Sequence, residues 1–162
     1  KSICEKNCKD LVKEILDNAK KYNCKINLPI DVCVSKNLSG SKKEKKIDKI
    51  DNEEMILDIG NETMKNIQKI VDNSKTILWN GPAGYFENPH FQTGTKNILN
   101  AIANKTIKDN IFSVAGGGET VAAINKFGDV KSFTFVSTAG GAFLEYLEGK
   151  TLPGIKALNN HE

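Results

Sequence analysis

Three glycine-rich stretches contain the residues whose types and spacing could do chemistry. They read NGPAGYFE at 80–87, GGGET at 116–120 and STAGGA at 137–142, and each follows a short apolar run. Where such a turn leads from a strand into a helix, the backbone N–H groups at the helix start can bind an anion. A helical pattern follows each of the three stretches, and the sequence predicts phosphate-binding loops at the second and the third.

The stretch at 116–120 also contains an acid and a hydroxyl. Gly117 and Gly118 would expose backbone N–H groups to a ligand, and Thr120 could add its hydroxyl. Glu119 places a carboxylate where a bound anion is expected. The two negative groups can share the site if Mg²⁺ bridges the carboxylate and the phosphate oxygens. A glutamate in a first helical turn also stabilises the helix dipole without any metal. Both interpretations of Glu119 stay open at this point.

The other two stretches offer weaker signals. Gly140 and Gly141 could hold a phosphate, or could simply form a tight connection. Asn80 could orient a ligand or cap its own turn, and Glu87, beyond a strand end, could accept ribose hydroxyls. The sequence contains neither the G-x-G-x-x-G dinucleotide fingerprint nor the G-x-x-x-x-G-K-[ST] P-loop. It therefore predicts a phosphate- or nucleotide-binding domain of another kind, with a place for Mg²⁺.

Alternating strand and helix patterns would position these loops. Short apolar runs predict strands at 25–35, 55–59, 76–79, 111–115 and 133–136. Apolar residues at helical spacing predict helices at 5–22, 62–71, 94–104, 119–127 and 142–148. This alternation is typical of a three-layer α/β fold, a mostly parallel, Rossmann-like sheet with helices on both faces. Right-handed crossovers would bring the carboxyl ends of the strands, and with them the three loops, to one crevice.

The front of the chain is interpreted as structural. The helix at 5–22 is expected to be a packing element. Pro29 cannot donate to a ladder, so we expect an edge strand, a bulge or a break within 25–35. Asp31 could be a functional carboxylate, but an acid with a role in a strand or turn is the favoured interpretation. The lysine-rich segment 39–54 is interpreted as a solvated excursion or exposed hairpin, with a polyanion-binding patch as the alternative.

Composition limits the classes of function. The chain has 162 residues, a net charge of +3 and no arginine, which argues against a protein specialised for nucleic acid. Its four cysteines form no C-x-x-C pair, which argues against zinc and predicts buried free thiols in a reducing cytosol. No apolar run approaches the ~20 residues of a membrane span, so we expect a cytoplasmic protein without a membrane partner. Because the sequence opens with KSICEKNC and no initiator Met, we expect a piece of a longer protein.

Six motifs occur in one order along the chain: LPIDVCV at 28–34, LDIG at 57–60, WNGPAGYFE at 79–87, FQTGT at 91–95, GGGET at 116–120 and STAGGAFLEYLEGKTLPGI at 137–155. Over essentially its whole length the sequence resembles the carboxyl-terminal part of phosphoglycerate kinase, in its bacterial form. The family pattern has Asp where Glu119 stands. The resemblance implies a transferase of glycolysis, a kinase that moves a phosphoryl group between 1,3-bisphosphoglycerate and ADP to give 3-phosphoglycerate and MgATP.

The resemblance also implies roles for individual residues. The bound ATP or ADP would be surrounded by Asn80, Gly81, Pro82 and Glu87, with Glu87 on the ribose. The phosphates and Mg²⁺ would be contacted by Gly117, Gly118, Glu119 and Thr120, with Glu119 as the metal ligand. The catalytic positions, which face the transferring phosphoryl group, would be Gly140 and Gly141.

By the same resemblance, residues 1–162 form part of a carboxyl-terminal nucleotide-binding domain. The amino-terminal domain, through which the family binds 3-phosphoglycerate, is absent, as are the first strands of the nucleotide domain. The sheet is therefore expected to be incomplete, with the strand at 25–35 short of neighbours. We expect a chain that is inactive alone and a monomeric parent. The alternatives are a stand-alone nucleotide-binding module and a structural fragment without catalysis.

Overall fold

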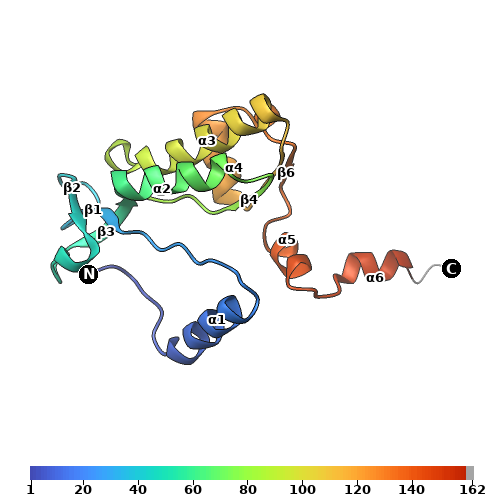
Figure 1. Cartoon of the computed structure of the whole chain (residues 1–162), viewed down its shortest axis with the longest axis horizontal. Coiled ribbons are helices and arrows are strands. Elements are labelled where there is room, and N and C mark those ends of the chain that lie inside the picture. Colours follow the sequence, from blue (N-terminus) through green and yellow to red (C-terminus); the bar gives the residue numbers. More distant parts are fainter. Residues whose placement is uncertain (160–162) are drawn as a thin grey trace.

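The computed structural model describes residues 1–159 of the chain. Its helices are α1 (Lys9–Lys21), α2 (Asn61–Asp72), α3 (Thr93–Asp109), α4 (Gly118–Phe127), α5 (Gly140–Leu147) and α6 (Pro153–Asn159). Its strands are β1 (Asp31–Ser35), β2 (Lys43–Lys46), β3 (Met55–Ile59), β4 (Thr76–Asn80), β5 (Phe112–Gly116) and β6 (Phe135–Ser137). Strands and helices alternate from β3 onward, which confirms the predicted α/β fold (Figure 1).

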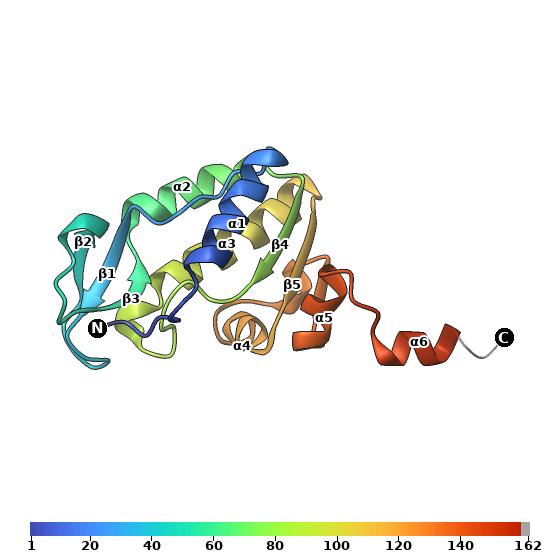
Figure 2. The same ribbon diagram turned by 90° about the horizontal axis from the view of Figure 1, so that it is seen from below.

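The strands form two sheets of three strands each. The first has the order β2-β1-β3 and is antiparallel, whereas the second, β4-β5-β6, is parallel. Figure 2 shows the two sheets at opposite ends of α2 and α3, which run from one sheet toward the other. The parallel arrangement therefore holds for the strands that carry the glycine-rich loops, and the front half of the chain departs from it.

The register of the parallel sheet brings the carboxyl ends of its three strands to one edge. Asn80 at the end of β4 pairs with Gly116 at the end of β5, and Gly116 pairs with Ser137 at the end of β6. The three glycine-rich loops therefore leave the sheet from adjacent positions, as the sequence predicts.

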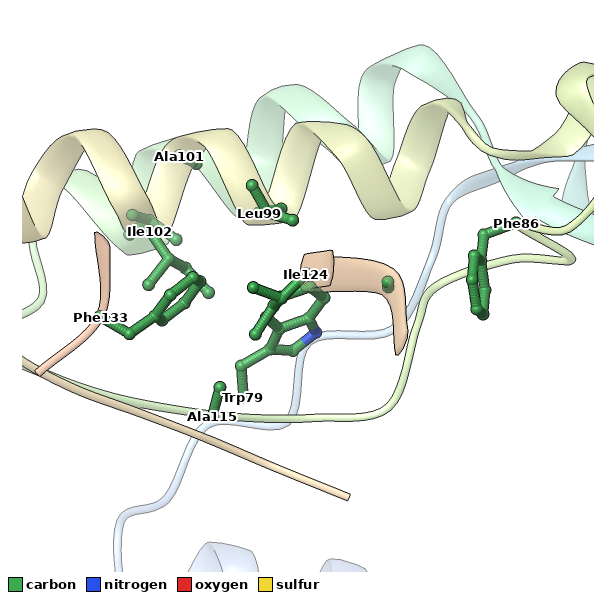
Figure 3. Packing of buried hydrophobic residues seen from close by; sticks show 10 residues of the cluster. Trp79, Phe86, Leu99, Ala101, Ile102, Ala115, Ile124 and Phe133 are labelled. Carbon is green, nitrogen blue, oxygen red and sulfur yellow. The ribbon is translucent and has the colours of Figure 1, made fainter. Parts of the chain in front are cut away.

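One face of the parallel sheet is buried against α3 and α4. Trp79 projects from this face into a cluster of buried apolar side chains that includes Leu99, Ile102, Ala115, Ile124 and Phe133 (Figure 3). The rings of Trp79 and Phe133 stack with their centroids 6.1 Å apart. Burial of each leucine, isoleucine or phenylalanine side chain in this cluster contributes roughly 1.5–3 kcal/mol. Because successive strand residues point to opposite faces, Leu78, next to Trp79, lies on the other face of the sheet, where it is 47% exposed.

Helix α1 is shorter and less buried than its sequence pattern predicts. It begins at Lys9 and not at residue 5, because Asn7 takes a left-handed backbone conformation with φ 64°. Its apolar side chains are about half exposed, and none of its residues is buried by the described part of the chain. Figure 1 shows α1 set apart from α2, α3 and α4. The predicted packing role is therefore wrong within residues 1–159.

The predicted strand at 25–35 breaks near its proline. β1 begins at Asp31, shortly after Pro29, and residues 25–30 are exposed and belong to no strand. β1 is central, with β2 on one side and β3 on the other, and its pairing with β3 shifts register between Cys33 and Val34. The strand is therefore confined to the residues after the proline and is central, so the predicted edge position is wrong, and the register shift lies between Cys33 and Val34 and not at Pro29.

Asp31 joins β1 to α2. Its carboxylate accepts hydrogen bonds from the backbone N–H groups of Glu62 and Thr63, which are free donors in the first turn of α2, and from the Thr63 hydroxyl. Burial alone would raise the pKa of Asp31, but these hydrogen bonds outweigh burial and lower that pKa. The favoured interpretation of Asp31 as a structural acid is confirmed.

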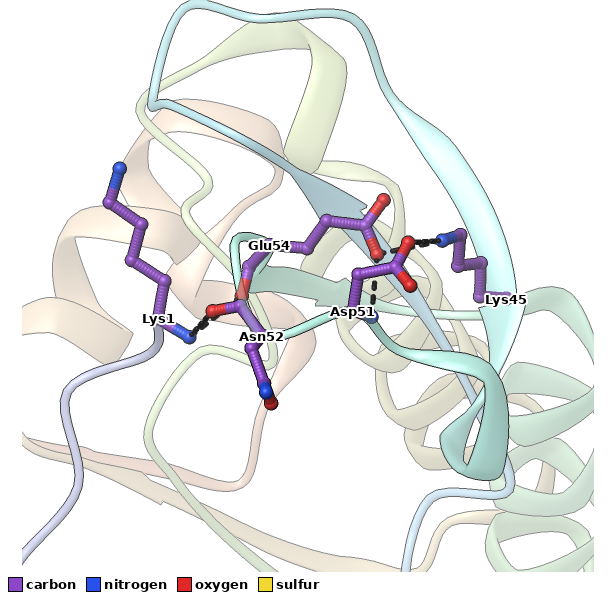
Figure 4. A network of polar contacts seen from close by, with 5 residues as sticks. All are labelled: Lys1, Lys45, Asp51, Asn52 and Glu54. Atoms are coloured by element: carbon purple, nitrogen blue, oxygen red, sulfur yellow. Dashed lines mark hydrogen bonds and ion pairs between the residues drawn. The ribbon is translucent and has the colours of Figure 1, made fainter.

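The lysine-rich segment is mostly exposed, as the sequence predicts, and supplies one strand, β2, whose antiparallel partner is the buried β1 outside the segment. The Nζ atom of Lys45 on β2 lies 2.7 Å from a carboxylate oxygen of Asp51 and 2.8 Å from one of Glu54 (Figure 4). The backbone amino group at the start of the chain, on Lys1, donates to the carbonyl oxygens of Asn52 and Glu54. The hydrogen bonds to Asp51 and then to Glu54 raise the pKa of Lys45. Acids of the same segment therefore pair with this lysine.

The four cysteines are free thiols, as predicted, but only Cys33 is buried, and Cys4 and Cys24 are exposed. No helix in the described part of the chain is both long and apolar enough to cross a membrane.

Candidate functional site

An open pocket lies at the carboxyl edge of the parallel sheet. It has a volume of about 280 Å³ and is lined by Asn80, Gly81, Gly117, Gly118, Glu119, Thr120, Gly140, Gly141 and Leu144. Eight of these nine residues are predicted site residues, and all three glycine-rich stretches contribute to them. The structure thus brings the predicted phosphate, metal and catalytic positions into one place.

The first wall of the pocket is the start of α4. Gly117 precedes the helix with φ +93°, a left-handed conformation that favours glycine. A Cβ on Gly117 would also lie 2.7 Å from Oδ1 of Asn80, so the two loops approach closely only because this residue is glycine. No side chain caps α4, and its first intrahelical hydrogen bond runs from the Val121 N–H to the Gly117 carbonyl. The N–H groups of residues 118–120 are therefore free for a ligand.

The second wall is the start of α5, which also has a glycine with positive φ and no side-chain cap. Gly140 has φ +46°, and a Cβ on either Gly140 or Gly141 would meet no atom within 4 Å. No side chain caps this helix either. Two uncapped helix starts therefore meet at one pocket, and each carries the partial positive charge of a helix N-terminus. Together they can bind an anion with more than one charged oxygen.

Thr120 links two loops of the site. Its side chain is fully buried, and its Oγ1 accepts a hydrogen bond of 2.7 Å from the Gly81 N–H. The indole N–H of Trp79 donates to the carbonyl oxygen of the same Gly81 at 2.8 Å. Both backbone groups of Gly81 are thus fixed, one by α4 and one by β4. The Thr120 hydroxyl that the sequence analysis offers to phosphate already serves as an acceptor within the protein.

Pro82 and Glu87 do not line the pocket. The loop that contains them turns away along α3 and β3, because the Ala83 N–H donates to Oγ1 of Thr95 and the Tyr85 N–H donates to the Leu57 carbonyl. Pro82 is half-buried in this loop, and the Glu87 side chain is exposed. Any contact of these two residues with a ligand would involve a part of it that extends beyond the pocket.

The partial positive charges at the pocket come from backbone N–H groups. Among its described lining residues Glu119 is the only ionisable side chain, and no lysine takes part. Within residues 1–159 no group of three His, Cys, Asp or Glu side chains is arranged to hold a metal ion. A metal here would depend on the Glu119 carboxylate and on oxygens of the ligand. That combination suits Mg²⁺, which usually takes one or two carboxylates together with substrate phosphates and water.

Leu144 is the lining residue that the sequence analysis missed. It lies four residues after Gly140, so it shares a face of α5 with the glycine at the helix start. The i, i+4 spacing from a pocket glycine is the signal that could have identified it. In the sequence this leucine is indistinguishable from a residue of the packing face of α5.

The sequence matches known proteins along nearly its whole length. The family model described as phosphoglycerate kinase matches residues 1–150. The chain is 44% identical over 160 residues to the phosphoglycerate kinase of Xanthobacter autotrophicus and 48% identical over 160 residues to that of Zymomonas mobilis. Each match covers 98% of this chain and 40% of the relative.

Solved structures agree with the sequence matches. The phosphoglycerate kinase of Coxiella burnetii is similar with a TM-score of 0.90 at 41% identity, and that of Pyrococcus horikoshii with 0.71 at 30%. Both matches cover 98% of this chain and 40% of the solved chain, so this chain spans about 40% of the length of its relatives. With sequence motifs, fold and pocket in agreement, the chain belongs to the phosphoglycerate kinase family.

Proposed function

We propose that this chain forms the nucleotide side of a phosphoglycerate kinase and binds the phosphates of ADP or ATP in the pocket at the sheet edge. The observation that carries the proposal is the meeting of two uncapped helix N-termini, those of α4 and α5, at one pocket lined mainly by glycines. Helix starts of this kind are common binding sites for phosphate groups.

Each part of the pocket has a role in this proposal. The N–H groups of Gly117, Gly118 and the first turn of α4 donate to phosphate oxygens of the bound nucleotide. The N–H groups of Gly140 and Gly141 face the phosphoryl group that is transferred and stabilise its charge. Phosphoryl transfer needs positioning and electrostatic stabilisation more than covalent chemistry, which suits a pocket lined mainly by glycine backbone.

Glu119 is proposed as the protein ligand of Mg²⁺, which would neutralise phosphate charge when bound. Its carboxylate is exposed at the first turn of α4, beside the donors expected to bind phosphate. Asn80, Gly81 and Pro82 are proposed to border the nucleotide, and Glu87 to accept the ribose hydroxyls. The distance of Pro82 and Glu87 from the pocket fits a nucleoside that extends beyond the phosphates along the loop after β4.

The reaction itself, transfer between 1,3-bisphosphoglycerate and ADP in glycolysis, is proposed for the longer enzyme. Because the family binds the glycerate substrate through a domain outside this chain, we propose that the chain alone does not catalyse the reaction. A cytoplasmic, monomeric parent without nucleic-acid or membrane partners completes the proposal. A coupled assay on the pure chain should show no ATP formation, and turnover similar to that of a full-length relative would contradict the expected inactivity.

Calorimetric titration of the chain with ADP, with and without Mg²⁺, tests nucleotide binding. We expect saturable binding that strengthens with Mg²⁺, and we expect Glu119→Gln to remove the strengthening while leaving the Mg²⁺-free affinity in place. A folded chain that binds no ADP at millimolar concentration would refute the proposal and leave a structural fragment. Equal Mg²⁺ dependence in wild type and Glu119→Gln would remove Glu119 as the metal ligand.

A further inference from the structure

Helix α4 holds both ends of the loop that follows β4. At the start of the helix, Oγ1 of Thr120 accepts the hydrogen bond from the Gly81 N–H. In its last turn, the ammonium group of Lys126 donates to the carbonyl oxygens of Phe86 and Glu87, at 3.2 and 3.3 Å. The first of these contacts lies at the pocket, and the second lies where the loop reaches Glu87.

The ammonium group of Lys126 is itself held in place by two aromatic rings. It lies 5.7 Å from the ring centroid of Phe86 and 5.2 Å from that of Phe127. The two rings meet edge to face, with centroids 6.1 Å apart. Cation–π attraction of this kind fixes an ammonium group at a partly exposed site, so that its protons can point at the loop carbonyls.

Lys126 binds backbone carbonyl oxygens of the loop and does not pair with the Glu87 carboxylate. Phe86 is buried and anchors the loop in the core, whereas Glu87 is exposed, so the direction of its side chain depends on how its backbone is held. Within residues 1–159 the Glu87 carboxylate forms neither an ion pair nor a hydrogen bond in the structure. It therefore remains available to a ligand.

We propose that Lys126 is a positioning residue for the nucleoside part of the nucleotide. It fixes the backbone at 86–87 and so sets where the Glu87 carboxylate meets the ribose hydroxyls. This inference rests on the proposed function, in which Glu87 takes that role. Lys126 lies at the opposite end of α4 from the free N–H donors, so its effect falls on the nucleoside and not on the phosphates.

The test compares Lys126→Met with Lys96→Met in the full chain, with ADP and inorganic pyrophosphate as ligands. Lys96 on α3 is the matched control because its ammonium group also lies over the Phe127 ring, at 4.7 Å, but makes no hydrogen bond to the loop among the described contacts. Loss of one or two charge-assisted hydrogen bonds should weaken ADP binding by Lys126→Met about three- to tenfold. Pyrophosphate binding should stay within about twofold, Lys96→Met should resemble wild type, and Lys126→Arg should restore ADP binding.

Hydrogen exchange on the ligand-free variants gives a second readout. Lys126→Met should raise the exchange of the backbone amides at 86–88 more than Lys96→Met does. The proposal is overturned if Lys126→Met binds ADP like wild type, or if it loses ADP and pyrophosphate equally. A wild-type chain that binds pyrophosphate but not ADP would overturn the role of Lys126 while leaving the phosphate pocket in place. A wild-type chain that binds neither would refute the proposed function, and this inference with it.

Discussion

The substitution Gly141→Glu tests whether the pocket binds an anion. Gly141 is the second residue of α5 and lines the pocket, and a Cβ at this position would meet no atom within 4 Å. A Cβ therefore fits at this position without a clash, and a glutamate would place a carboxylate among the donors proposed for phosphate. Gly154 is the matched control, because it is the second residue of α6, is equally open and lies outside the pocket.

The expected effect follows from the size of the pocket and from Coulomb's law. In a pocket of about 280 Å³ the new carboxylate and a bound phosphate would be close neighbours. Two unit charges 4 Å apart repel by about 1 kcal/mol in water and by about 4 kcal/mol at an effective dielectric constant of 20. ADP affinity should thus fall by between about fivefold and about 1,000-fold. Folding should not suffer, because glutamate is a better helix former than glycine and an acid stabilises a first helical turn.

The assay is calorimetric titration of wild type, Gly141→Glu and Gly154→Glu with ADP, accompanied by urea unfolding of all three. We expect Gly154→Glu to bind ADP like wild type and all three chains to unfold at similar urea concentrations. If Gly141→Glu binds ADP within twofold of wild type, or if Gly154→Glu is weakened as much, then the pocket is not the phosphate site.

Three further substitutions test contacts around the site and the fold. Thr120→Val leaves the Gly81 N–H without its acceptor and should lower the free energy of unfolding by about 1–3 kcal/mol in urea; a similar loss in Thr120→Ser, which keeps the hydroxyl, would contradict this. The lowered pKa of Asp31 contributes stability above the ordinary aspartate pKa, and this stability is lost as pH falls through the folded pKa. The difference in unfolding free energy between wild type and Asp31→Asn should therefore be smaller at pH 3 than at pH 7. A difference that is larger at pH 3 would contradict this prediction. Gly117→Ala should destabilise the chain by about 1–2 kcal/mol in urea unfolding because of its left-handed backbone, whereas Gly118→Ala should change little; equal effects would refute the need for glycine at 117.

The parallel half of the fold could be predicted because its signals are local. Each of its strands is a short apolar run with a glycine at its end or within three residues after it, and each is followed by a turn or helix start that can be recognised within a few residues. Once these strands are parallel, their carboxyl ends share an edge. That step alone placed eight predicted residues around one pocket.

The parts that could not be predicted depend on partners distant in sequence. β1 became the centre of an antiparallel sheet because the lysine-rich segment returned to pair with it, and nothing within residues 25–35 indicates that return. The buried hydrogen bond of Thr120 depends on Gly81, which is remote in sequence. The exposure of α1 also lay beyond reach, because an amphipathic pattern predicts an apolar face but does not identify what covers it.

The most direct test of the nucleotide site is an NMR titration of the chain labelled with ¹⁵N at glycine only. The chain has 13 glycines, so the spectrum is simple enough to follow each amide. On addition of ADP we expect the largest shifts at the four pocket glycines that open α4 and α5, namely Gly117, Gly118, Gly140 and Gly141, because the N–H of the fifth, Gly81, already donates to Thr120. Gly40 and Gly154, which lie elsewhere, should not move. Shifts that spare Gly117, Gly118, Gly140 and Gly141 while ADP binds would show that the nucleotide is held at another place and would contradict the site described above.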